Sequence, residues 1–234
     1  LKRRYHRAAF GLLWVFFSFF AFVFVKAVVF DQFAGDIAFS FPMYLASGFL
    51  VWQFMNGVVT DGTDVFVSAA NWLKGVPIPL STFVFQSVVR NVVTAGYACM
   101  VVVLLMVYEG QAVTWGTLLA LPGIAVCVVT SVWVQLLLGT VASRFRDFKH
   151  LVQTIMRITF FLTPVLWVPG ALGRLGEYTY WNPFANFIEV IRMPLLYGSV
   201  DPFHWAYVGI FSSLVAVVSL IVFALCRHRI IYWV

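Results

Sequence analysis

The chain consists mainly of long apolar stretches with few charges, and its arginine and lysine residues gather in the gaps between them. The first stretch, residues 8–30, carries bulky apolar side chains on every face of the helix it would form, and it follows Lys2, Arg3, Arg4 and Arg7. A helix that is apolar all round requires the bilayer as its solvent. Movement across a membrane is therefore the leading functional question.

The composition supports an all-α integral membrane protein. Hydrophobic residues make up 62% of the 234 residues and charged residues 10%, whereas soluble domains carry about 25% charged residues. The length allows about six spans of ~20 residues, and no stretch is long and polar enough for a separate soluble domain. We therefore predict a single transmembrane domain over residues 1–234. The predicted spans are 8–30, 39–59, 83–107, 115–141, 151–168 and 205–225.

The positions of the basic residues predict the orientation. Most of them lie at both termini and in the connectors 60–80 and 142–150, whereas the other connectors hold only Arg174 and Arg192. Because cytoplasmic loops are enriched in lysine and arginine, we place both termini and these two connectors in the cytoplasm. The connectors 31–38, 108–114 and 169–204 then face outward. The net charge of +6 is thus interpreted as topology and not as nucleic-acid binding.

Several kinds of site have no sequence support. The three cysteines are scattered without metal spacing, which favours small core residues. The chain contains no G-x-x-x-x-G-K-[ST] loop, no H-E-x-x-H and no G-x-S-x-G, so ATP binding of the usual kind and catalysis are not predicted. The first apolar stretch is too long for a signal peptide and is predicted to be retained as a span.

The connector 61–80 predicts a short cytoplasmic helix. Thr63 or Asp64 can provide the N-cap, and Gly75 suits the C-terminal end. The predicted apolar face consists of Phe66, Ala69, Ala70 and Leu73. Two interpretations carry equal weight: a rigid helix that another protein contacts, or an ordinary amphipathic connector lying on the headgroups.

The connector between the fourth and fifth spans is strongly basic. Arg144, Arg146 and Lys149 form a dense cationic turn, and Asp147 can pair with them locally. A topology-setting loop that binds lipid phosphates accounts for the positive charge. It does not require the aspartate or the interleaved aromatic residues, so a partner contact stays open.

The outward segment 182–192 predicts a short helix with a defined start. Asn182 is a favourable N-cap, Pro183 suits the first helical position, and Glu189 can pair with Arg192 at i, i+3. The apolar face consists of Phe184, Phe187, Ile188 and Ile191. The helix either covers the outer surface for stability alone or re-enters the membrane as a gate, and its length favours the gate.

Four charged residues fall inside or near predicted spans. Lys26 and Glu109 lie near the outer ends, where snorkelling accounts for both. Arg90 and Arg157 lie a turn or two inside the cytoplasmic face. They can bind an anionic phosphate that enters from that side, snorkel, or form an intramembrane ion pair.

In its ordered motifs the chain resembles permease subunits of ABC-2 type polysaccharide exporters, which include O-antigen, capsule and teichoic acid exporters. Together the motifs extend over nearly the whole chain. They are KRRYHRAAFGLLW (2–14), YLASGFLVW (44–52), NWLKGVPIP (71–79), RN (90–91), SRFRDFKHLV (143–152), FFLTPV (160–165), NPF (182–184) and IEVIR (188–192).

The resemblance implies a six-span subunit that pairs with a copy of itself and with two ATP-binding cassette subunits, which would hold the ATP and Mg²⁺. An amphipathic interfacial helix precedes the first span in the family, and residues 1–7 would be its end, so we expect most of it to be missing from this sequence. The implied ATPase-coupling residues are Asp64, Phe66, Asn71, Leu73 and Lys74. The implied substrate entrance consists of Arg144, Arg146, Asp147, Lys149 and Arg157. The implied external gate consists of Asn182, Pro183, Phe187, Glu189 and Arg192.

The expected function is export of a lipid-linked, O-antigen-like polysaccharide across the bacterial inner membrane, as one half of a channel in a homodimer driven by a separate ATPase. This subunit would then serve lipopolysaccharide biosynthesis without its own catalytic site. A close alternative is an ABC-2 permease for teichoic acid or another cargo. A distant one is a membrane enzyme acting on lipid-linked sugars.

Overall fold

The computed structural model describes residues 13–30, 40–70, 72, 78–111, 113–169 and 174–234, and this part of the chain is helical without any strand. The prediction of an all-α protein is therefore confirmed for it. The helices are α2 (Leu13–Phe30), α3 (Phe41–Gly62), α5 (Leu80–Tyr108), α6 (Trp115–Leu118), α7 (Ala120–Arg144), α8 (Phe148–Leu162), α9 (Arg174–Glu177), the 3₁₀ helix η3 (Tyr178–Trp181), α10 (Pro183–Tyr197) and α11 (Pro202–Trp233).

Three helical segments of the described chain are long and apolar enough to cross a membrane. They are α5, the continuous segment Trp115–Arg144 that joins α6 and α7, and α11. The shorter segment Leu13–Val29 is also apolar. Helix α3 has 22 residues but includes polar side chains such as Gln53, Asn56 and Asp61. Each predicted span thus contains a helix, and three of these helices have the length and hydropathy of a complete crossing.

The fifth predicted span, residues 151–168, is longer than the helix found there. Helix α8 ends at Leu162, and Thr163 has the extended dihedral angles φ −96° and ψ 135°. Pro164 explains this end, because proline lacks the N–H that would continue the helix and its ring pushes the preceding residue into extended backbone. At 15 residues, α8 is about 22 Å long, shorter than the ~30 Å hydrocarbon core.

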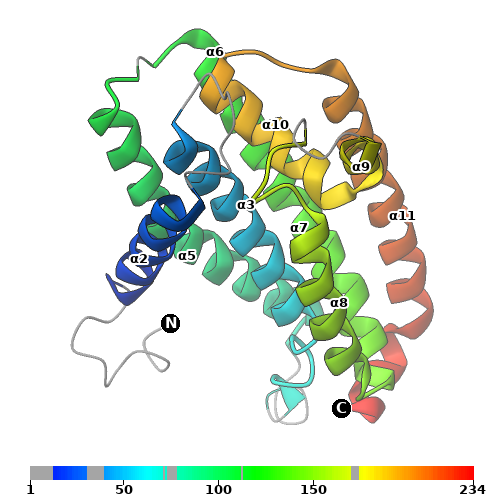
Figure 1. Cartoon of the computed structure of the whole chain (residues 1–234). Helices are drawn as coiled ribbons and strands as arrows, with labels where there is room; N and C mark the ends of the chain where they lie inside the picture. The colour runs from blue at the N-terminus through cyan, green and yellow to red at the C-terminus, as the bar shows by residue number, and fades with distance from the viewer. Residues whose placement is uncertain (1–12, 31–39, 71, 73–77, 112, 170–173) are drawn as a thin grey trace.

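Helix α3 lies at the centre of the bundle and packs against α2, α5, α7, α8 and α10. Helix α11 packs along α7, and α10 is inserted among α3, α7 and α11 (Figure 1). The largest core cluster joins Trp52 of α3, Cys127 of α7, Ile188 of α10 and Val208 of α11. The bundle therefore holds α10 from several sides.

The two ends of the bundle bring together different connectors. At one end the residues after α3, the turn between α7 and α8, and the last residues of α11 surround one cavity. At the other end the Gln111 side chain donates to the carbonyl oxygens of Leu195 and Leu196, each at 3.3 Å. Gly198 ends α10 there with a positive φ of 61°.

Candidate functional site

The connector after α3 begins differently from the prediction. Helix α3 continues to Gly62, and the Thr63 hydroxyl donates to the Thr60 carbonyl at 2.7 Å, so Thr63 closes α3 and does not cap a new helix. Helical turns follow, with the Ser68 N–H donating to the Asp64 carbonyl at 2.8 Å. The Asp64 carboxylate pairs with the Lys149 ammonium. The proposed N-cap role of Thr63 is therefore wrong.

The connector turns one apolar face towards the bundle. Phe66 is fully buried in a cluster with Val84 and Val88 of α5, Leu136 of α7 and Ile230 of α11. Gly139 of α7 makes this packing possible, because a Cβ there would lie 2.4 Å from a methyl group of Val65. In this position Phe66 cannot touch a partner protein, so a coupling role for it would act through the bundle.

The opposite face of the connector is exposed. Val67 is 46% exposed and Trp72 is 59% exposed, and Ser68 lies between them. A tryptophan exposed at the end of a bundle is a common element of protein interfaces. Trp72 was not among the predicted coupling residues, although an aromatic side chain in this connector was a usable signal. Three predicted coupling residues, Asn71, Leu73 and Lys74, lie outside the described residues.

The basic turn between α7 and α8 lies next to this connector. The Arg144 guanidinium lies 5.6 Å from the centroid of the Phe145 ring and 5.9 Å from that of Trp233. Arg146 is exposed. Asp147 takes the N-cap position of α8, where its carbonyl accepts from the N–H groups of residues 150 and 151 and its side chain makes no capping bond.

One cavity of about 450 Å³ joins the connector to the basic turn. Its connector wall includes Asp64 and Val67, its other wall includes Arg146 and Lys149, and Trp233 of α11 closes one side. The structure thus places members of two separately predicted sets, ATPase coupling and substrate entrance, around the same space.

Arg157 does not belong to that cavity. It lies on the exposed side of α8, whose buried residues are Val152 and Met156. Arg90 of α5 has a defined partner, because its guanidinium lies 2.9 Å from the Asp61 carboxylate of α3. Asn91 donates to the same carboxylate at 3.3 Å. Of the three interpretations of Arg90, the structure thus shows an ion pair.

The start of α10 agrees with the prediction. The Asn182 side chain accepts from the Phe184 N–H at 3.0 Å, and Pro183 takes the first helical position. The amide group of Asn182 also donates to the Thr163 hydroxyl at 3.0 Å. Asn182 therefore ties the beginning of α10 to the end of α8.

Arg192 is the most deeply buried charge of α10, with 1% of the residue exposed. It forms the predicted ion pair with Glu189, and its Nη1 donates to the Pro164 carbonyl at 2.9 Å. Its guanidinium lies 3.9 Å from the centroid of the Tyr44 ring. Arg192 thus joins α10, the break after α8, and α3. Because Phe187 is also buried, α10 is enclosed by the other helices of the bundle.

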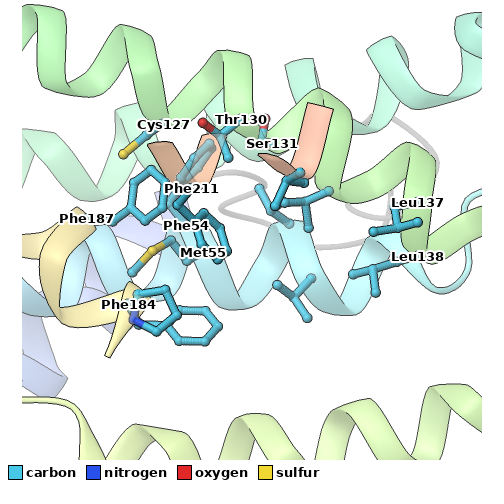
Figure 2. Close-up of a pocket in the computed structure, with 15 residues that line it drawn as sticks. Phe54, Met55, Cys127, Thr130, Ser131, Leu137, Leu138, Phe184, Phe187 and Phe211 are labelled. Atoms are coloured by element: carbon cyan, nitrogen blue, oxygen red, sulfur yellow. The ribbon is translucent and has the colours of Figure 1, made fainter. Parts of the chain in front are cut away.

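An apolar cavity of about 270 Å³ lies among α3, α7, α10 and α11. Figure 2 shows Phe54 and Met55 of α3 facing it together with Phe184 and Phe187 of α10. Thr130 of α7 also lines it, but its hydroxyl donates to the Val126 carbonyl at 2.7 Å. The walls are therefore suited to a hydrocarbon group. Within the described residues, no three His, Cys, Asp or Glu side chains gather as a metal site.

No protein-family model matches the chain. Among curated proteins it is 25% identical over 167 residues to the O-antigen export system permease protein RfbA of Myxococcus xanthus, an alignment that covers 71% of this chain and 64% of that protein, slightly under two thirds. Two proteins of the same name from Klebsiella pneumoniae are 21% and 22% identical over 231 and 234 residues, in each case 98% of this chain and 89% of the relative.

These relatives and the apolar helices indicate a multi-pass membrane protein. Together the three similarities support assignment of the chain to the family of ABC-2 type O-antigen export permeases.

Proposed function

We propose that this chain is the membrane subunit of an ABC transporter that exports a lipid-linked, O-antigen-like polysaccharide across the bacterial inner membrane. The observation that carries the proposal is the similarity to two O-antigen export permeases over 98% of the chain. The subunit would cross the membrane six times with both termini in the cytoplasm, and two copies would enclose the channel. The nucleotide and Mg²⁺ would bind to a separate ATPase subunit.

The geometry of the connector suits transmission of force from such an ATPase. Its exposed face, with Val67 and Trp72, would contact the ATPase, and its buried face, with Phe66, packs on α5, α7 and α11. A displaced connector would therefore move the ends of three helices. The Asp64–Lys149 pair extends the contact to α8, where the proposed substrate entrance begins.

The first test concerns the ATPase contact. Changing Trp72 to aspartate is expected to reduce recovery of the ATPase subunit by about tenfold or more, because buried tryptophans at interfaces commonly contribute at least ~2 kcal/mol. The measurement is co-purification of a co-expressed ATP-binding cassette subunit of an O-antigen export system with tagged permease. Trp115→Asp makes the same change on an exposed tryptophan at the opposite end of the bundle and should leave recovery unchanged. Equal recovery with both variants would exclude Trp72 as a contact.

The second test concerns the substrate entrance. Changing Arg144, Arg146 and Arg157 together to glutamate is expected to reduce ATP-dependent export at least about tenfold, because cationic groups there would offset the charge of the entering lipid phosphate. The measurement is surface polysaccharide in cells whose own permease gene is deleted. Since basic residues also set topology, cysteine labelling of the connector must show unchanged orientation. Export at the wild-type level in a correctly oriented variant would show that the entrance lies elsewhere.

A further inference from the structure

The Asp64–Lys149 ion pair joins the two walls of the 450 Å³ cavity at the connector end of the bundle. Asp64 belongs to the connector, and Lys149 lies in the first turn of α8. The two residues are 85 positions apart in the sequence, so the pair is a tertiary contact and not a local one. It lies where a moving connector and an entering cargo would meet.

The charges of the cavity favour an anion over a second cation. Lys149 has three donor hydrogens, and the Asp64 carboxylate binds only part of them. Arg146 adds a permanent positive charge to the same wall of the cavity. Both side chains of the pair are accessible, with 40% of Asp64 and 37% of Lys149 exposed. Exposed ion pairs of this kind are weak and separate readily. A phosphate group can therefore compete with Asp64 for Lys149.

We infer that the connector senses the cargo through this competition. The phosphate of the lipid-linked cargo and the Asp64 carboxylate bind Lys149 alternately, so cargo binding releases the first turn of the connector from α8. Phe66 remains packed in the bundle, so the connector tilts about this side chain and its exposed residues move away from α8. The inference rests on the proposed function for the identity of the phosphate carrier, whereas the competition itself depends only on the cavity.

The competition has a reciprocal consequence. Phosphate binding to Lys149 weakens the hold of α8 on the connector. When the ATPase pulls the connector away, Lys149 must therefore bind phosphate more tightly by the same factor. Removal of the Asp64 charge imitates the released state. Asp64→Asn is therefore expected to bind an isoprenyl pyrophosphate roughly two- to fivefold more tightly, the range that an exposed ion pair can supply.

The test uses the full chain in lipid nanodiscs of neutral phosphatidylcholine, with farnesyl pyrophosphate as the probe. Spin labels at positions 68 and 151, both exposed in the structure, report the separation of connector and α8, after Cys99, Cys127 and Cys226 are replaced by serine. In the wild type the probe should lengthen this separation. In Asp64→Asn the separation should be long without the probe, and in Lys149→Gln the probe should have no effect.

The matched control is Glu109→Gln, which removes one carboxylate at the other end of the bundle. It should leave both the separation of the labels and the affinity for the probe unchanged. Inorganic pyrophosphate in place of the probe should give the same change at higher concentration, since it lacks the lipid. The inference is overturned if Asp64→Asn binds the probe no more tightly than the wild type. It is also overturned if anionic phosphatidylglycerol alone gives the full change, because the cavity would then respond to the bilayer surface. The proposed function is tested separately: it would be contradicted if the chain neither bound an ATPase subunit nor supported export.

Discussion

Replacement of Arg192 by alanine is expected to lower the free energy of unfolding by about 3–5 kcal/mol, which would leave little folded protein in detergent. The guanidinium neutralises Glu189, donates to the Pro164 carbonyl and lies over the Tyr44 ring while almost completely buried. Its removal leaves a carboxylate and a carbonyl without their partner in the same enclosed space. The measurement is the loss of monodisperse protein on heating, followed by size-exclusion chromatography.

Two further variants distinguish the loss of the buried Arg192–Glu189 pair from the loss of any arginine side chain. Arg157→Ala removes an exposed arginine of α8 and should change the unfolding temperature little. The double variant Glu189→Gln, Arg192→Met removes both charges and keeps the side-chain length, so it should recover a large part of the lost stability. If Arg192→Ala is as stable as Arg157→Ala, the buried contacts of Arg192 contribute no net stability to this fold.

Local sequence spacing was sufficient to predict the start of α10, although the helix continues through Pro194 to Tyr197. Asn182 and Pro183 mark the start of a helix by their side-chain chemistry alone, and Glu189 and Arg192 fall on one face because they are three residues apart. Of the predicted apolar face, Phe187, Ile188 and Ile191 are buried, whereas Phe184 is half-buried. Such features depend on neighbours within a few positions, so they are visible in a single sequence.

Contacts between distant segments were not predictable in the same way. Arg90 was compatible with three interpretations until α3 brought Asp61 next to it. Lys149 appeared as one cation of a basic turn, and only the packing of the connector on that turn gave it Asp64 as a partner. The length of α8 was overestimated because the apolar residues after Pro164 were counted into the span, although proline ends the helix.

For Phe66 of the connector, the sequence also did not show which segment the side chain contacts. Helical spacing correctly grouped Phe66 with Ala69, and both are buried. The resemblance to exporters assigned Phe66 to the ATPase contact, but an apolar face can pack either on a partner or on its own bundle, and the period is the same in both cases. The exposure of Val67 and Trp72 identifies the outer face. A direct test of this arrangement is to empty the space that Phe66 fills.

Phe66→Ala is expected to cost about 3–5 kcal/mol at the connector, the usual range for removal of a fully buried phenylalanine. The loss should appear locally, because the connector is held to α5, α7 and α11 chiefly through this cluster. Hydrogen exchange of a peptide spanning residues 63–72 should become faster, while exchange in α5 and α7 stays close to that of the wild type. In the complex, ATP hydrolysis should continue and export per ATP should fall at least about tenfold, since this loss of contact energy exceeds 1.4 kcal/mol, a factor of ten in equilibrium.

The matched control is Phe85→Ala, which removes the same side chain from an exposed position of α5 and should leave both exchange and export unchanged. A second comparison is Gly139→Val, which fills the same contact from the α7 side and should displace the connector, because even a Cβ at this position would lie 2.4 Å from Val65. Loss of export in Phe66→Ala and Gly139→Val, but not in Phe85→Ala, would show that force passes through this packing. Normal export in Phe66→Ala, despite faster exchange in the connector, would show that the ATPase drives the channel through another contact.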